Sequence, residues 1–316
     1  AVTSAGDYDA ILSKLIPSFC QGDKGMPPTT AMWIRTINTL KARNILVNKQ
    51  LAAMQPADWQ SILTLTNSGV QATDFIFTGR TTATGDFLPA SSGYVAAKIQ
   101  SSGSGGGTYK LSERWVQEFK AGDLRKTQNV RTGANWIGNS DRGNAFNTRH
   151  TLINGGNGLA GTYSYVNTTP EAFELALVST YEENALMRAE ALINTGQVDQ
   201  GLALVDAVRT YMGAGLAPVA NTGLTQVQAQ EELRRERRIA LAFRGLSFYD
   251  ARRYKISEPA AAGGGRTGCV VVSNAGTLNT NATIEYGYLD YWDVPDNELA
   301  YNPAASGSAP TKNPKQ

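Results

Sequence analysis

The densely charged segment of residues 231–254 constrains the fold of this chain more than any other part of the sequence. It reads EELRRERRIALAFRGLSFYDARRY, and the residues of one mainly apolar stripe recur at helical spacing. That stripe consists of Leu233, Arg237, Ala240, Leu241 and Phe243. The neighbouring Arg234, Arg235 and Arg238 fall largely on other faces. We therefore expect an amphipathic helix that docks by its stripe and turns its charges to water or to partner carboxylates.

Both ends of this predicted helix carry terminating signals. Thr225 is a suitable N-cap, and Glu231 and Glu232 lie toward the front of the helix, ahead of the arginines. Gly245 suits the left-handed position past the C-terminal end. On these signals alone, the segment is a solvated amphipathic helix of an α-helical protein.

The same segment resembles a family signature. It is similar to the pattern ERR-x-EL-x-FEG-x-R-x-x-DL-x-R-W of the SusD/RagB family, whose members are nutrient-binding outer-membrane lipoproteins. The matching positions are Glu236, Arg237, Arg238, Leu241, Phe243, Gly245, Asp250, Arg252 and Arg253, with Tyr254 at an aromatic position. Ala240 and Arg244 replace acidic residues of the pattern, and Ser247 replaces a basic one. We expect rewired ion pairs here, and arginines that clasp a helical half of the protein to a loop-rich half.

A second block, Thr180–Gly213, supports the resemblance. It has the length of one tetratricopeptide helix pair, and Gly196 separates its two halves. The predicted stripes are Ala185, Leu186, Ala189 and Leu192 in the first helix, and Leu202, Val205, Val208 and Tyr211 in the second. The block resembles the family segment in which an LMRAEA helix precedes a partner helix ending in a VR motif.

Three more amphipathic helices are predicted near the N-terminus, at residues 7–19, 29–52 and 57–72. Asp58 is a candidate cap for the third. We expect the basic residues Arg35, Lys41 and Arg43 to pair with carboxylates at helix ends rather than to bind a ligand.

Residues 78–170 differ in composition, being rich in Gly, Ser, Asn and Thr. We predict irregular structure here, with a short helix at 113–119 and strands near 95–99 and 163–166. The glycine-rich stretch at 102–108 lacks the Gly-Lys-Ser/Thr ending of a phosphate-binding loop, so we interpret it as a flexible loop. Loops on a rigid scaffold often carry function.

Composition excludes several classes of protein. The net charge of +2 gives no reason to expect a nucleic-acid partner, and no run approaches the roughly 20 apolar residues of a spanning helix. Cys20 and Cys269 lack metal-ligand spacing, and we interpret them as isolated thiols, with a disulfide left open. We expect no metal and no cofactor.

Catalytic motifs are also missing from the sequence. His150 is the single histidine and has no recognisable nucleophile motif beside it, so we interpret it as polar surface on a loop. Acidic residues crowd the C-terminal tail at Asp290, Asp293, Asp296 and Glu298. The tail resembles the closing segment of the family, which packs back on the body, and we favour that role over a glycosidase pair or a calcium site. We predict that the chain is not an enzyme.

Sugar recognition requires aromatic faces for stacking and polar groups for hydroxyls. The middle loops supply both, whereas Trp115, in a short predicted helix, is expected to serve packing. The candidate ligand-binding residues are Trp136, Asn139, Asp141, Arg142, Asn144, Tyr163 and Tyr165.

The resemblance implies a mainly α fold. Tetratricopeptide-like helix pairs would form a right-handed superhelical scaffold, joined to a loop-rich ligand-binding half with a few short strands. We divide the chain into an N-terminal helical region (1–78), a loop-rich ligand-binding region (79–175), the helix pair with the signature helix (176–256) and an irregular closing segment (257–316), all within one compact unit. The chain is short for the family, and we expect the first helix pair to be absent.

The resemblance also implies a function. A SusD-like surface lipoprotein captures oligosaccharides and delivers them to a SusC-like TonB-dependent transporter in the outer membrane, held there by an N-terminal lipid anchor that this sequence does not contain. One alternative is an oligopeptide-binding member of the family. The other is a tetratricopeptide-type adaptor that binds a protein segment.

Overall fold

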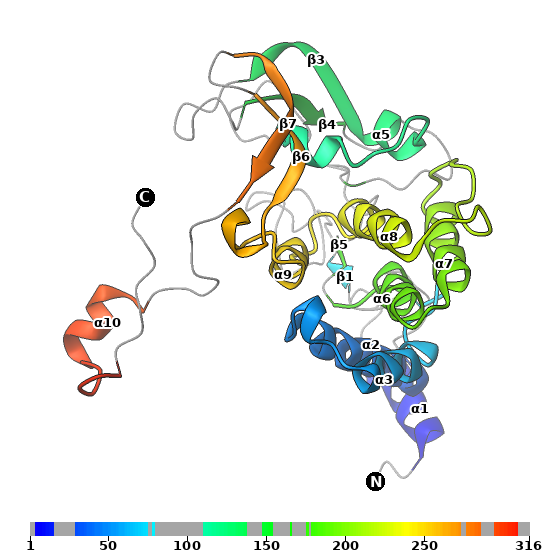
Figure 1. Cartoon of the computed structure of the whole chain (residues 1–316). Helices are drawn as coiled ribbons and strands as arrows, with labels where there is room; N and C mark the ends of the chain where they lie inside the picture. Colours follow the sequence, from blue (N-terminus) through cyan, green and yellow to red (C-terminus); the bar gives the residue numbers. More distant parts are fainter. Residues whose placement is uncertain are drawn as a thin grey trace.

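The computed structural model describes residues 4–15, 29–74, 78–79, 110–137, 147–153, 165, 175–176, 178–272, 276–285 and 294–308. The predicted strand at 95–99, the glycine-rich stretch at 102–108 and Cys20 lie outside these residues. Within them, helices form successive layers: α2 and α3, then α6 and α7, then α8, with a small sheet beyond α8 (Figure 1).

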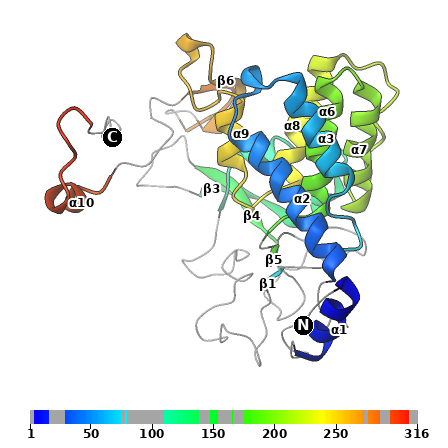
Figure 2. The ribbon, with the colours of Figure 1, turned by 90° about the horizontal axis from the view of Figure 1, so that it is seen from below.

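The three helices predicted near the N-terminus are present, and the second and third each end five residues earlier than predicted. They are α1 (Ala5–Leu15), α2 (Thr30–Val47) and α3 (Pro56–Asn67), with the short 3-10 helix η2 (Leu51–Ala53) between α2 and α3. Figure 2 shows α2 and α3 lying side by side and covering α6.

The ends of these helices follow ordinary capping chemistry. The side chain of Thr29 accepts a hydrogen bond from the backbone of Met32 at the start of α2. At α3 the cap is Gln55, and Asp58, predicted as the cap itself, sits three residues later and completes a capping box. The buried seam between α2, α3 and α6 contains Ala42, Leu46, Met54, Trp59, Ile62, Met187 and Ala191.

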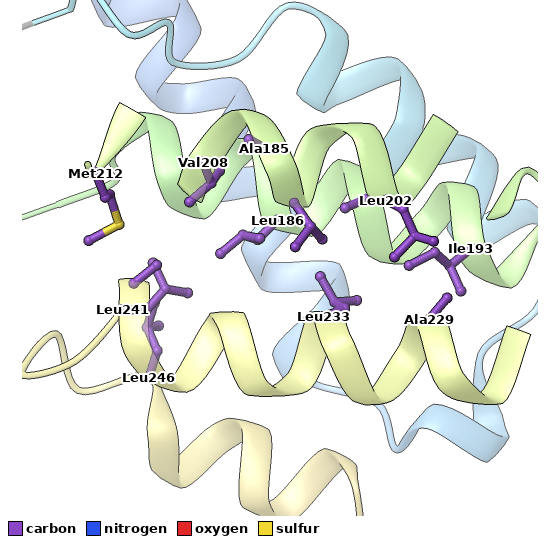
Figure 3. Close-up of a cluster of buried hydrophobic side chains, with 13 residues drawn as sticks. Ala185, Leu186, Ile193, Leu202, Val208, Met212, Ala229, Leu233, Leu241 and Leu246 are labelled. Carbon is purple, nitrogen blue, oxygen red and sulfur yellow. The ribbon is translucent and has the colours of Figure 1, made fainter. Parts of the chain in front are cut away.

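The predicted helix pair is present as α6 (Tyr181–Asn194) and α7 (Val198–Tyr211). Gly196 joins them at φ 85°, a left-handed conformation that favours glycine. Gly201 lets α7 approach α6, because a Cβ atom here would lie 2.8 Å from the carbonyl oxygen of Ala189. Side chains from α6, α7 and α8 form the main apolar core, which includes Leu186, Leu202, Val205 and Leu233 (Figure 3).

The charged segment forms two helices rather than one. Thr225 caps α8 (Gln226–Ala240), as predicted, and accepts a hydrogen bond from the backbone of Gln228. The helix ends at Ala240, and a turn then leads into α9 (Ser247–Arg253). Within the turn, Phe243 adopts φ 64° and Gly245 adopts φ 73°. Gly245 therefore has the predicted left-handed conformation, although it follows a turn and not the helix directly.

A three-stranded antiparallel sheet lies on the other side of α8. Its order is β2 (Lys110–Leu111), β4 (Thr148–Leu152) and β3 (Val130–Ile137). Two short helices, α4 (Glu113–Val116) and α5 (Leu124–Asn129), connect β2 to β3. The inner face of the sheet packs with these helices and with α8; the buried residues are Leu111, Val116, Phe119, Val130, Leu152, Tyr165 and Ile239.

Residues 257–308 depart from the predicted irregular closing segment. After the 3-10 helix η7 (Ala260–Ala262), a hairpin forms from β6 (Arg266–Val272) and β7 (Leu278–Ile284), and it packs beside α4. The prediction that the tail packs back on the body is not met. The last helix, α10 (Asp296–Tyr301), lies apart from the other helices in both views, and Tyr301 is 85% exposed (Figures 1 and 2). A further two-residue pair joins β1 (Thr78–Gly79) and β5 (Leu175–Ala176).

Candidate functional site

The arginines of α8 connect the helical layers to the sheet. Both terminal nitrogens of Arg234 donate to the carboxylate of Glu118, at 3.0 and 2.8 Å, and Glu118 belongs to the turn after α4. Arg238 lies 3.2 Å from the same carboxylate. The clasp predicted between the two halves of the protein is therefore confirmed.

A fully buried carboxylate forms the centre of this clasp. Glu236 of α8 accepts hydrogen bonds from Arg125 of α5 and from Arg209 of α7. Asp123, the N-cap of α5, accepts from Arg125 as well. A charge can be buried at acceptable cost only when it is paired, and each of these groups has partners of opposite sign. We call these residues, with Glu118, Arg234 and Arg238, the ionic clasp.

A second buried network joins α8, α9 and α6. Arg237 donates two hydrogen bonds of 2.9 Å to Asp250, and Arg253 bridges Asp250 and Glu190. Burial opposes ionisation of Asp250, but the two arginines hold the pKa of its carboxyl below the usual value. Arg237 thus occupies the inward stripe as an ion-paired residue. The interpretation of α8 as a solvated helix is wrong, because Arg234, Glu236 and Arg237 are buried in ion pairs.

The basic residues of α2 and the turn after α8 also serve structure. Arg43 pairs with Glu183 in the first turn of α6, as predicted. Arg35 also pairs with a carboxylate, but its partner Asp74 lies in the loop after α3 and not at a helix end. Lys41, assigned the same role, is exposed on α2. Arg244, which replaces an acidic residue of the signature, pairs with Glu182 at 3.1 Å.

The sheet held by the ionic clasp presents one of the predicted ligand residues to solvent. Trp136 of β3 is 36% exposed, and the guanidinium carbon of Arg149 lies 4.8 Å from the centre of its ring. Glu113, the first residue of α4, accepts hydrogen bonds from the side chain and the backbone of Arg149. This places a fixed aromatic ring and a fixed cation next to each other at the surface.

A β-bulge brings Trp136 to this position. Thr132 pairs with His150, and Ile137 pairs with Thr148, so four residues of β3 lie opposite the single residue Arg149. Extra residues in one strand bend it and re-aim its side chains. The bulge therefore accounts for the approach of Trp136 to Arg149.

The interpretation of His150 as polar loop surface is wrong. It lies in β4 with 5% exposure, its Nε2 atom is 3.0 Å from Glu113, and its Nδ1 atom is 2.9 Å from the hydroxyl of Thr132. Burial lowers the pKa of His150, against the opposing effect of Glu113. Burial alone would raise the pKa of Glu113, but hydrogen bonds from Arg149 and the nearby His150 hold it below its usual value. His150 therefore supports the carboxylate that orients Arg149.

Tyr165 lies inside the protein. It is 2% exposed, its hydroxyl donates to the carbonyl of Ile239 at 2.9 Å, and its ring contacts those of Trp115 and Phe243. Tyr165 was predicted to bind a ligand, but a side chain this deeply buried is not open to a ligand at the surface. Trp115 serves packing, as predicted, and its indole nitrogen donates to the carbonyl of Arg238. The other candidate residues lie outside the described part of the chain: Asn139, Asp141, Arg142, Asn144 and Tyr163.

Sequence reasoning missed Arg149 and Glu113. Only the apolar-polar alternation around His150 and Leu152 could have indicated β4, and a five-residue strand gives a weak signal. The contact between Glu113 and Arg149 spans 36 residues and depends on the pairing of β2 with β4.

A separate open groove of about 790 Å³ lies between α2 and α3. Its lining is mixed: Ile37, Leu40, Lys41, Asn44, Ile45, Gln60, Ser61, Thr64 and Leu65. Within the described ranges, no cluster of three His, Cys, Asp or Glu residues could hold a metal ion, and no helix is long and apolar enough to cross a membrane. Cys269 is a buried free thiol.

Comparison with known proteins supports the resemblance seen in the sequence. A sequence model described as "SusD_RagB: SusD family" matches residues 181–307, which contain both segments that carried the resemblance. The proteins of that family are non-catalytic binding proteins. No curated protein has a sequence that matches this chain.

Solved structures show the same fold. A SusD-like protein from Bacteroides fragilis is 16% identical with a TM-score of 0.52, and the alignment covers 94% of this chain and 67% of that one. A SusD-like carbohydrate binding protein from Bacteroides vulgatus is 13% identical with a TM-score of 0.50, covering 98% and 65%. A SusD superfamily protein from Bacteroides vulgatus is 16% identical with a TM-score of 0.42, covering 79% and 56%. The two structures with TM-scores of 0.52 and 0.50 confirm the predicted mainly helical, SusD-like fold with a few short strands. This chain spans 56 to 67% of the length of the three solved chains.

Proposed function

We propose that this chain, whose residues 181–307 match the sequence model of the SusD family, is a non-catalytic protein that captures a glycan on the outer surface of its β2-β4-β3 sheet. The observation that carries the proposal is the exposed ring of Trp136, fixed beside Arg149 on that sheet. An exposed aromatic face can stack on the apolar face of a sugar ring, and a neighbouring charged group can meet its hydroxyls.

The surroundings of Trp136 favour recognition over catalysis. The carboxylate of Glu113 is occupied by Arg149 and His150, and it is 5% exposed. A glycosidase needs two carboxylates facing one bond, and no second carboxylate contacts this group among the described residues. Glu113 therefore orients the guanidinium group of Arg149 and holds it in place even when no ligand is bound.

We further propose that the bound glycan is an oligosaccharide delivered to a SusC-like TonB-dependent transporter at the outer membrane, where a lipid anchor holds proteins of this kind. The match of residues 181–307 to the SusD family model supports this step. Co-purification of the lipidated precursor with a large outer-membrane barrel is the expected result. A precursor that stays in the cytoplasm would contradict it.

The first prediction concerns Trp136→Ala. Loss of a stacking ring should weaken glycan binding by on the order of 1 to 3 kcal/mol, or roughly 5- to 160-fold. Calorimetry against panels of glycans and peptides measures it. Trp33→Ala is the matched control, because Trp33 on α2 is also 36% exposed and lies in a different layer. Equal affinities for the two folded variants would remove Trp136 from the site.

The same calorimetry distinguishes the alternatives. Binding of peptides in place of glycans, with the same loss in Trp136→Ala, would support an oligopeptide-binding member. The groove between α2 and α3 favours the third possibility, an adaptor that binds a protein segment. A protein partner whose binding is lost in Ile37→Ala and retained in Trp136→Ala would support the adaptor.

A further inference from the structure

Three arginines of α8 share two carboxylates. Arg234 donates to Glu118 and to Glu231, so it joins the two acids in one network. Arg235 lies 3.9 Å from Glu231, and Arg238 lies 3.2 Å from Glu118. Because Arg235 and Arg238 are three positions apart on the helix, their side chains are neighbours on its surface. This network therefore has more cations than anions.

A fourth arginine comes from the hairpin that packs beside α4. Arg266, the first residue of β6, donates to Glu231 at 3.2 Å. No other carboxylate pairs with Arg235, Arg238 or Arg266 in the described part of the chain. Four guanidinium groups are therefore balanced by only two carboxylates. We call Arg235, Arg238 and Arg266 the arginine cluster.

The surplus of positive charge acts on Arg238. Burial lowers the pKa of its guanidinium group, Glu118 raises this pKa, and the nearby cations Arg234 and Arg266 lower it again. Because a guanidinium group stays protonated in proteins, Arg238 remains a cation that its basic neighbours repel. Glu118 alone does not offset burial and repulsion together.

The arginine cluster also contains hydrogen-bond donors without acceptors. The Nε atoms of Arg238 and Arg266 are buried and form no hydrogen bond, and the terminal nitrogens of Arg238 form none with the described residues. An unsatisfied buried donor costs free energy, and a bound ion is one of the groups that can satisfy it. The side chains of Arg235, Arg238 and Arg266 are 28, 30 and 22% exposed, so the cluster is open to a small ion from solvent.

We propose that the arginine cluster binds a phosphate or sulfate group, either as a free ion or as part of a larger molecule. The oxygens of such a group accept hydrogen bonds from guanidinium nitrogens, whose planar arrangement suits them. The anion supplies the negative charge that Glu118 and Glu231 do not provide. This site belongs to α8 and β6 and not to the sheet that holds Trp136, so it goes beyond glycan capture and does not depend on it.

Calorimetry and thermal unfolding of the whole chain test the site. Titration with inorganic phosphate should show saturable binding, whereas chloride at the same ionic strength should show none. An ion that binds the folded state alone raises Tm, and we expect phosphate to raise it by about 3 °C more than chloride does. Phosphate also stabilises proteins in general, because it is excluded from their surfaces, so the comparison with variants decides.

Two variants on different elements locate the binding. Arg238→Gln and Arg266→Gln should each weaken phosphate binding by about tenfold and lose most of the extra rise in Tm. Arg266 lies outside the ionic clasp, so its variant remains informative even if Arg238→Gln does not fold. Arg188→Gln on α6 is the matched control, because Arg188 has no ion pair among the described residues, and it should bind phosphate as the native chain does.

A sugar phosphate distinguishes the two sources of the anion. Tighter binding of glucose 6-phosphate than of inorganic phosphate would support a group carried by an organic ligand, and equal binding would support the free ion. If phosphate shows no saturable binding, or if Arg238→Gln and Arg266→Gln both keep full affinity, the arginine cluster is not an anion site. Either of these results overturns the inference and leaves glycan capture, which Trp136→Ala tests, unaffected.

Discussion

Arginines have opposite surroundings in two neighbouring regions of this protein. In the ionic clasp, Arg125 is fully buried between Asp123 and Glu236, and Arg234 is nearly buried against Glu118. On β3, Arg131 is exposed and has no ion pair in the described part of the chain. The contrast shows that an arginine in the sequence can have either of two roles, which depend on its surroundings in the fold. A paired and buried arginine fixes one element on another, whereas an exposed one remains available to a ligand.

The energetic consequences of the two settings should differ just as strongly. Removing one partner of a buried pair leaves an uncompensated charge in a medium of low polarity, which is expensive. Removing an exposed charge changes the free energy of unfolding very little, because water already solvates it. The following predictions test this difference, beginning with the largest effect.

Glu236→Gln should produce the largest loss of stability. Glu236 is completely buried and accepts from both Arg125 and Arg209, so its loss leaves two guanidinium groups short of a counter-charge. We expect the free energy of unfolding to fall by about 3 to 5 kcal/mol, measured by denaturant titration. Asp9→Asn on α1, where the carboxylate accepts from Thr30 outside the clasp, is a control that should lose much less. If both variants lost the same free energy of unfolding, the claim that the buried ion pairs of the ionic clasp contribute most to stability would be refuted.

Glu231 lies at the edge of the clasp and should give a smaller, pH-dependent effect. Burial opposes its ionisation, but hydrogen bonds from Arg234 and Arg266 lower its pKa to about 2, from a usual value of 4.5. Because the folded value is the lower one, the ionised form stabilises the protein above pH 4.5, and this contribution is lost as the pH falls toward 2.

The size of the effect is limited by solvent, since 44% of the Glu231 side chain is exposed. We expect about 1 kcal/mol, seen as the difference in unfolding free energy between the native chain and Glu231→Gln. That difference should be present at pH 6 and shrink progressively below pH 4.5. A difference that stayed constant down to pH 2.5 would show that ion pairing does not cause it.

Much of the helical half was predictable from the sequence. The period of the apolar residues identified α2, α3, α6 and α7, and Thr225 marked the start of α8. These signals are local: a stripe, a cap and a breaker within one segment. The end of α8 was harder to predict, because the apolar spacing continues to Phe243, which adopts a left-handed conformation that is rare for an aromatic residue.

The sheet and the partners of the buried charges were not predictable in this way. The eight residues of β3 contain a bulge and are exposed on both faces along most of their length, so they show no alternation. The pairs that matter join distant residues: Arg234 and Glu118 are 116 positions apart, and Arg125 and Glu236 are 111 apart. The spacing of residues in the sequence cannot predict contacts between residues so far apart. For Trp136, composition correctly suggested an exposed ring, and only the fold revealed Arg149 beside it.

The most direct test of the account measures stability and binding together in two arginine variants. Arg234→Gln and Arg131→Gln change the same chemical group, in the ionic clasp and on strand β3 respectively. Denaturant titration gives the free energy of unfolding, and calorimetry with the tightest-binding glycan gives the affinity. We expect Arg234→Gln to lose about 3 kcal/mol of stability and keep its affinity when folded, and Arg131→Gln to keep its stability within about 0.5 kcal/mol and lose affinity. A reversed pattern, or equal effects of both variants on both quantities, would contradict the separation of structural and ligand-binding arginines.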